Sequence, residues 1–350
     1  MLLHPAGLFL VVIARAQQDS AHAPAIFGDS LVDVGNNNYI PSTALANYTP
    51  YGIDFGFPTG RFCNGFTVVD YGARLLGLPL IPPCLSPTSK GANITKGLNY
   101  ASKAAGILDE TGKNYGARIS MNEQIRLFEN TVKEDLPPLF ESPKALHSYL
   151  EKSIGSNDYI NNYLMPHIYT SSRIYNAEAS ADHLIRNFSQ QLIKLYNLGA
   201  RKMVLTEIGT LGCIPNQLSM ANADNGCVER VNNLGILFND RLAQLTKTLN
   251  STLPGSFFVY QSVYQTFYDM VIHPSNYGFF VANAACCGNG RYGGEVTCLP
   301  SQIPCSDRSQ YLFWDAFHPT QAVNDIIANR CYSQNATDCS PISIYQLAQI

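Results

Sequence analysis

The sequence predicts an α/β fold in which helices cover both faces of a mostly parallel sheet. Short apolar runs alternate with amphipathic helical segments along much of the chain, as in successive β-α-β units. The length of 350 residues and a hydrophobic fraction of 46% allow one large core. Neither an interdomain linker nor an internal repeat is visible. We therefore expect a single domain over residues 24–350.

The amino terminus predicts an atypical secretory signal peptide over residues 1–16. An apolar stretch at 7–14 ends in an Ala-Arg-Ala pattern that suits cleavage near Gln17, although the usual positively charged start is missing. No later stretch approaches the ~20 apolar residues that a membrane span needs. We therefore expect no integral membrane segment in the mature chain.

The first expected strand, residues 25–27, leads into Gly28-Asp29-Ser30. Just past the carboxyl end of a strand in an open α/β sheet, a side chain faces the crevice where ligands bind. Backbone N–H groups of the following turn can stabilise an anion there. Ser30 is therefore the candidate nucleophile. Taken alone, such a tripeptide is more often a turn whose serine caps a helix, so the hypothesis needs a base elsewhere.

The elements that follow are expected from apolar spacing and turn residues. Residues 47–64, rich in proline, glycine and aromatics, predict an ordered surface loop. Helices are expected at 66–76 and 121–132, and a second strand at 98–101. A third strand over 146–154 is poor, because a glutamate and a lysine interrupt a run that a buried parallel strand normally keeps apolar.

The second half of the chain is clearer. It predicts a helix at 181–198, a strand at 202–206, a long helix at 229–249 and a strand at 257–260. This succession of strand and helix implies the mostly parallel, doubly covered sheet.

Composition narrows the class of protein. The chain has 23 basic and 26 acidic residues and no Lys/Arg run, so its charge argues against nucleic acid as a ligand.

Ten cysteines, none in a Cys-x-x-Cys pair, argue for disulfides rather than a zinc or redox motif. Five glycosylation sequons point the same way, to the secretory pathway. The sequons begin at Asn47, Asn93, Asn187, Asn250 and Asn335. The local cysteine pairings to test are Cys213 with Cys227, Cys331 with Cys339, and an open pairing of Cys286 and Cys287 with Cys298 and Cys305.

The segment 288–293 formally fits Gly-x-Gly-x-x-Gly. It neither follows a convincing strand nor opens a helix, as a dinucleotide site would. We interpret it as part of a cross-linked surface loop over 283–306.

His318 is the candidate base. Asp315 precedes it by three residues, and in a turn of roughly helical pitch this spacing brings both side chains to one face. The carboxylate can then hold Nδ1–H and leave Nε2 for the serine. Pro319 would suit the first turn of the helix that follows. The alternative is that Asp315 is a helix cap and His318 a surface residue.

An oxyanion hole requires donors aimed at the charge that develops on the carbonyl oxygen. The Ser30 N–H, the Asn157 side-chain amide and an N–H from the turn after the second strand are candidates. Read alone, the Gly-x-Asn-Asp sequence around Asn157 is more often simply a turn. The chain contains no Gly-x-Ser-x-Gly, which excludes the ordinary nucleophile elbow.

Four blocks together resemble the plant-type GDSL esterase/lipases of the SGNH hydrolase superfamily, over nearly the whole chain from residue 24. The blocks are Gly28-Asp29-Ser30-Leu31-Val32-Asp33, Asn99-Tyr100-Ala101-Ser102 through Gly106, Gly155-Ser156-Asn157-Asp158, and Asp315-Ala316-Phe317-His318-Pro319. The resemblance implies a three-layer α/β/α sandwich with a flavodoxin-like sheet, the SGNH hydrolase fold. It also implies the site residues: Ser30 as nucleophile, His318 as general base and then acid, Asp315 as its orienter, and Ser30, Gly106 and Asn157 as oxyanion donors.

The chain departs from the family pattern at two kinds of position. The family often has glycine where Lys103 stands, so we assign the second-block donor to Gly106, although Lys103 could still give its N–H. The strands before the first and third blocks are shorter than usual, which would remove ladder hydrogen bonds at the centre of the sheet.

The resemblance predicts a serine esterase/lipase that hydrolyses small-molecule, lipid or polymer esters through an acyl-enzyme, without metal or organic cofactor. We expect a secreted, glycosylated monomer outside the cell, with the cell wall as one location. The alternative is a catalytically weak or inactive family member that binds an acylated ligand or glycan.

Overall fold

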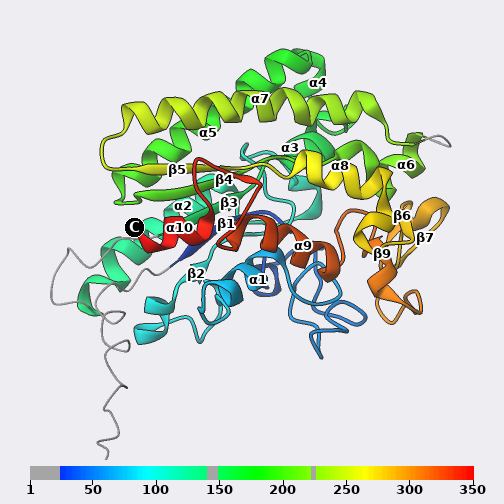
Figure 1. Ribbon diagram of the computed structural model, residues 1–350, viewed down its shortest axis with the longest axis horizontal. Coiled ribbons are helices and arrows are strands. Elements are labelled where there is room, and N and C mark those ends of the chain that lie inside the picture. The colour runs from blue at the N-terminus through cyan, green and yellow to red at the C-terminus, as the bar shows by residue number, and fades with distance from the viewer. Residues whose placement is uncertain (1–23, 140–148, 222–225) are drawn as a thin grey trace, which may run out of the picture.

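The computed structural model of the protein describes residues 24–139, 149–221 and 226–350, so the expected signal peptide lies outside the described residues. Its centre is a six-stranded sheet in the order β10-β5-β4-β3-β1-β2 (Figure 1). The strands are β1 (Ala25–Gly28), β2 (Leu98–Asn99), β3 (Tyr149–Ser153), β4 (Lys202–Thr206), β5 (Phe257–Gln261) and β10 (Cys339–Ser340). All neighbours are parallel except β10, which runs antiparallel to β5. The order 2-1-3-4-5 is flavodoxin-like, which confirms the predicted sheet.

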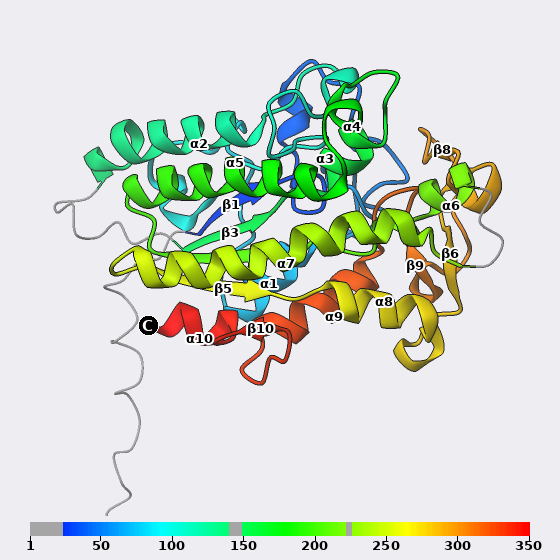
Figure 2. The same ribbon diagram turned by 90° about the horizontal axis from the view of Figure 1, so that it is seen from above.

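Helices cover both faces of this sheet and complete three layers. The helices α2 (Met121–Asn130), α5 (Ala177–Asn197) and α7 (Glu229–Thr252) lie on one face. The helices α1 (Val68–Leu75), α9 (Gln321–Tyr332) and α10 (Ile344–Gln349) lie on the other. Figures 1 and 2 show the two groups from the side and from above. The shorter helices are α3 (Ser156–Asp158), α4 (Ser171–Ile174), α6 (Pro215–Ala221) and α8 (Tyr264–Ile272).

The strands bury alternate side chains against the two helical layers. In β1, Ile26 belongs to the same apolar cluster as Val69 of α1. The next residue, Phe27, faces the opposite layer and contacts Phe128 of α2, with 5.5 Å between ring centroids. Because successive side chains of a strand point to opposite faces, four residues suffice to anchor β1 in both cores.

Two sequence-based expectations need comment. The poorly predicted third strand forms as β3 and pairs with both β1 and β4, so the short strands β1 and β3 keep their pairing within the sheet. Residues 146–148 of the prediction lie outside the described residues.

Placing Pro319 in the first turn of a helix was wrong. Helix α9 begins at Gln321 with Thr320 as N-cap, because Pro319 pairs with Phe313 in an isolated bridge.

Four disulfides lie in the described part of the chain, and all fall within the local groups considered above. They join Cys213 to Cys227, Cys286 to Cys305, Cys287 to Cys298, and Cys331 to Cys339. The disulfides of Cys286 with Cys305 and of Cys287 with Cys298 cross-link residues 281–313, which we call the disulfide-linked lobe. The lobe contains β6 (Val281–Ala285), β7 (Gly288–Asn289), β8 (Val296–Thr297) and β9 (Tyr311–Phe313), so the surface loop expected there has strands.

No helix within the described ranges is both long and apolar enough to cross a membrane.

A buried ion pair joins the loop at 47–64 to helix α1. Arg61 donates from Nε and Nη2 to the two carboxylate oxygens of Asp70, both at 2.7 Å. The side chains are 7% and 1% exposed. Asp70 also accepts from the N–H and the hydroxyl of Thr67, which caps α1. The loop therefore depends on one fully desolvated carboxylate.

Replacing Arg61 with leucine leaves the carboxylate of Asp70 buried without its cation. We expect Arg61→Leu to lower the free energy of unfolding by roughly 3–5 kcal/mol, measured by urea denaturation. The matched control is Arg126→Leu, which breaks the exposed pair with Glu123 and should leave stability almost unchanged. Equal effects of the two variants would contradict this account.

Three buried carboxyl groups lie near the carboxyl edge of the sheet. Burial raises the pKa of Asp29 to about 7, with added repulsion from Asp158 and Asp33. Burial also raises the pKa of Asp33 and of Asp158 to about 6. Among the described residues, the Oδ2 atom of Asp29 has no hydrogen-bond partner, which accounts for its less favourable ionisation.

The raised pKa of Asp29 sets the sign of a pH effect on stability. Between its ordinary pKa of 3.8 and the folded value of about 7, the native protein binds more protons than the unfolded chain. The contribution of Asp29 to stability is therefore lost as the pH rises through this window. We expect Asp29→Asn, which cannot titrate, to lose less of its thermal midpoint than the wild type between pH 5 and pH 7, by calorimetry. Parallel pH profiles would refute the assignment.

Candidate active site

The predicted site residues lie in loops that follow strands: β1, β2 and β3 of the six-stranded sheet, and β9 of the separate two-stranded sheet for Asp315 and His318. Ser30 comes two residues after β1, and Asn157 lies in α3, just after β3. Lys103 and Ala104 follow β2. Because β1 lies between β2 and β3, these three loops meet at the same edge of the sheet. This edge is where chain connections leave the sheet in opposite directions, the usual place for a ligand in this architecture.

The structure brings Ser30, His318 and Asp315 together in one hydrogen-bonded chain. Ser30 Oγ lies 2.7 Å from His318 Nε2, across 288 positions of sequence. His318 Nδ1 lies 2.8 Å from Asp315 Oδ1. All three side chains are buried, and Asp315 is completely so. The arrangement is that of a nucleophile, its base and the group that orients the base.

The carboxylate of Asp315 is held by more than the imidazole. It accepts the backbone N–H groups of Phe317 and His318, each at 2.9 Å, and the hydroxyl of Tyr51 at 2.5 Å. Burial alone would raise the pKa of Asp315, but the charge of His318 and the hydrogen bonds from His318 and Tyr51, together with the charge of Lys103, lower it to about 2. Asp315 therefore stays ionised at neutral pH.

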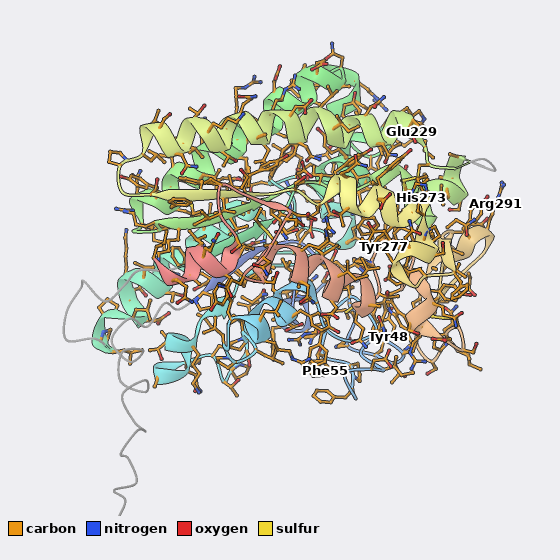
Figure 3. The ribbon with its side chains drawn as sticks, in the orientation of Figure 1. Tyr48, Phe55, Glu229, His273, Tyr277 and Arg291 are labelled. Atoms are coloured by element: carbon orange, nitrogen blue, oxygen red, sulfur yellow. A yellow bond between two sulfur atoms is a disulfide. The ribbon has the colours of Figure 1, made fainter. Side chains whose placement is uncertain are left out.

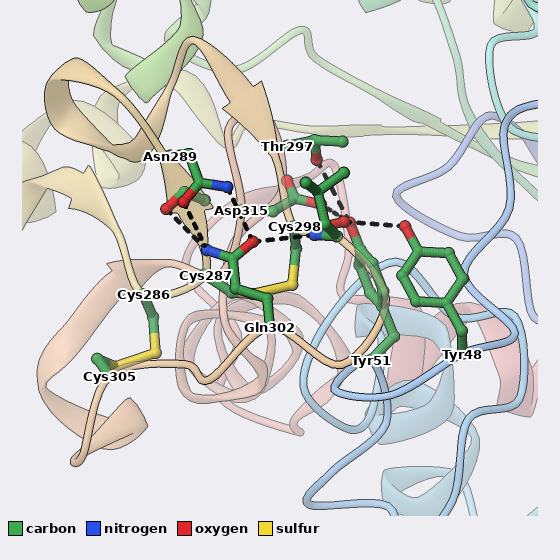
Figure 4. Close-up of a disulfide and its surroundings, with 12 residues drawn as sticks. Tyr48, Tyr51, Cys286, Cys287, Asn289, Thr297, Cys298, Gln302, Cys305 and Asp315 are labelled. Atoms are coloured by element: carbon green, nitrogen blue, oxygen red, sulfur yellow. Dashed lines mark hydrogen bonds between the residues drawn. A yellow bond between two sulfur atoms is a disulfide. The ribbon is translucent and has the colours of Figure 1, made fainter.

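Tyr51 is the site residue that sequence reasoning missed. It belongs to the loop at 47–64, and 264 positions separate it from Asp315, so no local motif marks it. Burial and the adjacent charge of Asp315 raise its pKa well above the usual range, so its hydroxyl remains a donor. Figure 4 shows Tyr51 beside Asp315, next to the disulfide of Cys287 and Cys298.

The disulfide-linked lobe supports the segment that carries the base. The N–H of Cys287 donates to the carbonyl of Trp314 at 2.7 Å, and the N–H of Cys286 to that of Phe313 at 3.0 Å. On the other side, the hydroxyl of Tyr48 donates to the carbonyl of Cys298 at 2.9 Å (Figure 4). The lobe thus links the 47–64 loop to the residues just before Asp315.

Asn157 is oriented by two hydrogen bonds. Its Nδ2 donates to the carbonyl of Ala105 at 2.9 Å, and its Oδ1 accepts from Asn161 at 2.6 Å. One N–H of the amide group remains for another acceptor, and Asn157 lines the same cavity as Ser30. Its placement suits the oxyanion role expected for it.

Three residues of the second block bear on the remaining donor: Gly106 and Lys103, which the sequence offers, and Ala104. Gly106 does not line the cavity; its backbone passes so close to Asp158 that a Cβ would lie 2.6 Å from Oδ1. The N–H of Lys103 is taken up by Asp33 and Asn37. Ala104 lines the cavity and has a φ of 61°, which turns its backbone out of the ordinary path. The geometry therefore favours the N–H of Ala104 over Gly106.

Two carboxylates fix the loop that carries Ala104. Asp33 accepts the N–H of Lys103 at 3.2 Å, on one side of Ala104. Asp158 accepts the N–H groups of Ile107 and Leu108, at 2.7 and 3.1 Å, on the other. Holding both ends of a short loop preorganises the backbone between them.

A cavity of about 470 Å³ opens beside Ser30. Much of its lining is apolar, including Leu211, Ile214, Val263, Phe267, Phe317 and Ile327. A pocket of this kind can bury an acyl or alkyl chain while the polar groups at Ser30 fix the reacting carbonyl.

A second histidine–aspartate pair occurs at the end of α8, where His273 Nδ1 lies 2.9 Å from Asp269. Figure 3 labels His273 and the neighbouring Tyr277. Both side chains are exposed, and the second partner of Asp269 is Tyr277. This pair lacks the buried environment of His318. Within the described ranges, no group of three or more histidine, cysteine or carboxylate side chains is arranged to hold a metal ion.

Comparison with known proteins agrees with the geometry. A family model described as GDSL-like Lipase/Acylhydrolase matches residues 25–331. GDSL esterase/lipase 7 of Arabidopsis thaliana is 61% identical over 344 residues, covering 96% of this chain and 94% of that protein. GDSL esterase/lipase At1g29670 of the same plant is 49% identical over 350 residues, covering 98% and 95%. With a family match over most of its length and relatives this similar, the chain belongs to the GDSL-like lipase/acylhydrolase family.

Proposed function

We propose that this carboxylic ester hydrolase cleaves lipid or acyl esters through an acyl-enzyme formed on Ser30. The observation that carries the proposal is the unbroken hydrogen-bonded chain from Ser30 Oγ through His318 to the buried carboxylate of Asp315. The relatives are named esterase/lipases, which supports the same reaction class. Because the three groups are intact and in contact, nothing favours the alternative of an inactive ligand-binding protein.

The chemistry follows from the positions of the protons. His318 Nε2 takes the hydroxyl proton as Ser30 Oγ attacks the ester carbonyl, and Asp315 stabilises the imidazolium that forms. As the carbon–oxygen bond to the alcohol breaks, His318 gives the proton to the leaving oxygen. Water then attacks the acyl-enzyme, with His318 again as base, and the acid product leaves with Ser30 restored.

The negative oxygen of each tetrahedral intermediate needs donors that are already in place. We assign this role to the N–H groups of Ser30 and Ala104 and to the side-chain amide of Asn157. Ala104 replaces Gly106 in this assignment for the geometric reasons given above. The hydrogen bonds to Asp33 and Asp158 make the second-block loop a fixed part of this site.

The cavity supports an apolar acyl or alkyl group on the substrate, because burial of such a group among apolar side chains is favourable. We further propose that the protein is secreted, glycosylated and located outside the cell, the cell wall included. The disulfides support this location. The sequon asparagines Asn47, Asn93 and Asn335 are exposed, as glycosylation requires.

Removing the nucleophile or the base tests the proposal directly. We expect Ser30→Ala and His318→Ala each to lower kcat for ethyl butyrate hydrolysis by roughly 10⁴-fold, with little change in the thermal midpoint. The measurement is acid release at constant pH by the purified protein. His273→Ala is the control, because the exposed His273–Asp269 pair lies in a different part of the chain. A folded Ser30→Ala protein with wild-type activity would overturn the proposed mechanism.

Tyr51 is a positioning residue that acts through Asp315. We expect Tyr51→Phe to lower kcat about tenfold, since a hydrogen bond to a charged group contributes about 1.5–3 kcal/mol and 1.4 kcal/mol is a tenfold change. KM should stay nearly constant, because Tyr51 does not line the cavity. Tyr48→Phe is the matched control, as its hydroxyl reaches only the carbonyl of Cys298. A change confined to KM would contradict the role given to Tyr51.

A further inference from the structure

Lys103 places a positive charge beside the catalytic histidine. Its Nζ lies 4.1 Å from the centroid of the Phe62 ring, and the Phe62 ring centroid lies 5.3 Å from that of His318. Lys103 also lines the cavity next to Ser30.

The ammonium of Lys103 is not paired with a carboxylate. Within the described residues, Nζ makes no ion pair and no side-chain hydrogen bond. The acidic groups whose charge reaches it are Asp33 and Asp315, and both are engaged by backbone N–H groups or by His318 and Tyr51. The contact that remains is the face of Phe62, which stabilises a cation weakly.

Three other carboxyl groups line the cavity, those of Asp29, Glu207 and Glu295, and within the described residues none of them is within ion-pair distance of Lys103. Burial raises the pKa of Asp29 to about 7, so this carboxyl is only partly ionised at pH 7. Glu207 accepts hydrogen bonds from the hydroxyl of Tyr260 and from three donors of residues 262–264. Its charge is therefore already compensated. Burial lowers the pKa of Lys103 to about 8, so the group remains largely protonated at pH 7 while it lacks full hydration. A partly desolvated, unpaired cation of this kind gains most from an anionic ligand.

The backbone fixes where that ligand would lie. The N–H of Lys103 is held by Asp33 and Asn37, so the base of the side chain is anchored. The next residue, Ala104, supplies the N–H that we assign to the oxyanion hole. A substrate carbonyl at Ala104 therefore lies beside the residue that carries the ammonium, in the cavity that both residues line.

We propose that Lys103 is a specificity-determining residue that gives this enzyme a preference for esters carrying a second, free carboxylate close to the scissile carbonyl. Half-esters of short dicarboxylic acids have this chemistry. The inference rests on the proposed function, since it places the scissile carbonyl at Ser30 and Ala104. An alternative role for the ammonium, general stabilisation of the oxyanion, would assist neutral and anionic esters equally.

The test compares two esters of similar size, monoethyl succinate and ethyl butyrate, by acid release at constant pH. The readout is the ratio of their kcat/KM values. We expect Lys103→Gln to lower the ratio about tenfold, as loss of one charge-assisted hydrogen bond implies. Lys103→Arg should keep most of it. Lys113→Gln, at an exposed position, is the control and should not change the ratio. An unchanged ratio in Lys103→Gln, even with both rates reduced, would overturn the inference.

A binding measurement decides the point independently of catalysis. In a Ser30→Ala background, calorimetric titration should give tighter binding of monoethyl succinate than of ethyl butyrate, and the added Lys103→Gln change should abolish the difference. Equal binding before that change would refute the role of Lys103 even if the wild type hydrolyses both esters. Conversely, a wild type that hydrolyses neither ester contradicts the proposed function, while the binding result still tests Lys103.

Discussion

The hydrogen bonding of one buried carboxylate, that of Asp315, is the interaction on which the rest of the site depends. A desolvated carboxylate is stable only if its oxygens are well supplied with donors. Here two backbone N–H groups, an imidazole and a phenol provide them. The tight turn from Asp315 to His318 supplies three of these donors locally. The fourth, Tyr51, requires a loop from the beginning of the chain to be folded against the disulfide-linked lobe.

The sheet also determines how three separate loops come together around the position proposed for the substrate carbonyl. Strand β1 has only four residues, yet it is paired on both sides. Parallel pairing brings the carboxyl ends of β1, β2 and β3 to one edge. Ser30, the loop of Ala104 and the amide of Asn157 therefore follow neighbouring strands. Asp33 and Asp158 restrict the movement of the Ala104 loop, because their carboxylates accept hydrogen bonds from its backbone N–H groups.

The site residues that the sequence could predict are those marked by their neighbours in the chain. Ser30 follows a strand directly, and Asp315 and His318 are three residues apart, so strand position and turn spacing were enough to propose them. The outcome at Ala104 could not be read in this way, because it depends on which N–H groups of residues 102–108 are consumed by carboxylates from two other loops. Tyr51 could not be predicted either, because its contact also depends on a segment far away in the sequence. Its partner is 264 positions away, and nothing in a proline- and glycine-rich loop specifies which hydroxyl faces inward.

The long sequence separation within the site has a consequence for how the protein is made. Ser30 emerges early in synthesis, and His318 follows 288 residues later, near the end of the chain. In the mechanism proposed above, the serine is an ordinary alcohol with no group to take its proton until the segment from the lobe to His318 has folded onto β1. A growing or truncated chain is thus chemically silent toward the esters around it. In that mechanism, hydrolytic activity is a property of the finished molecule alone.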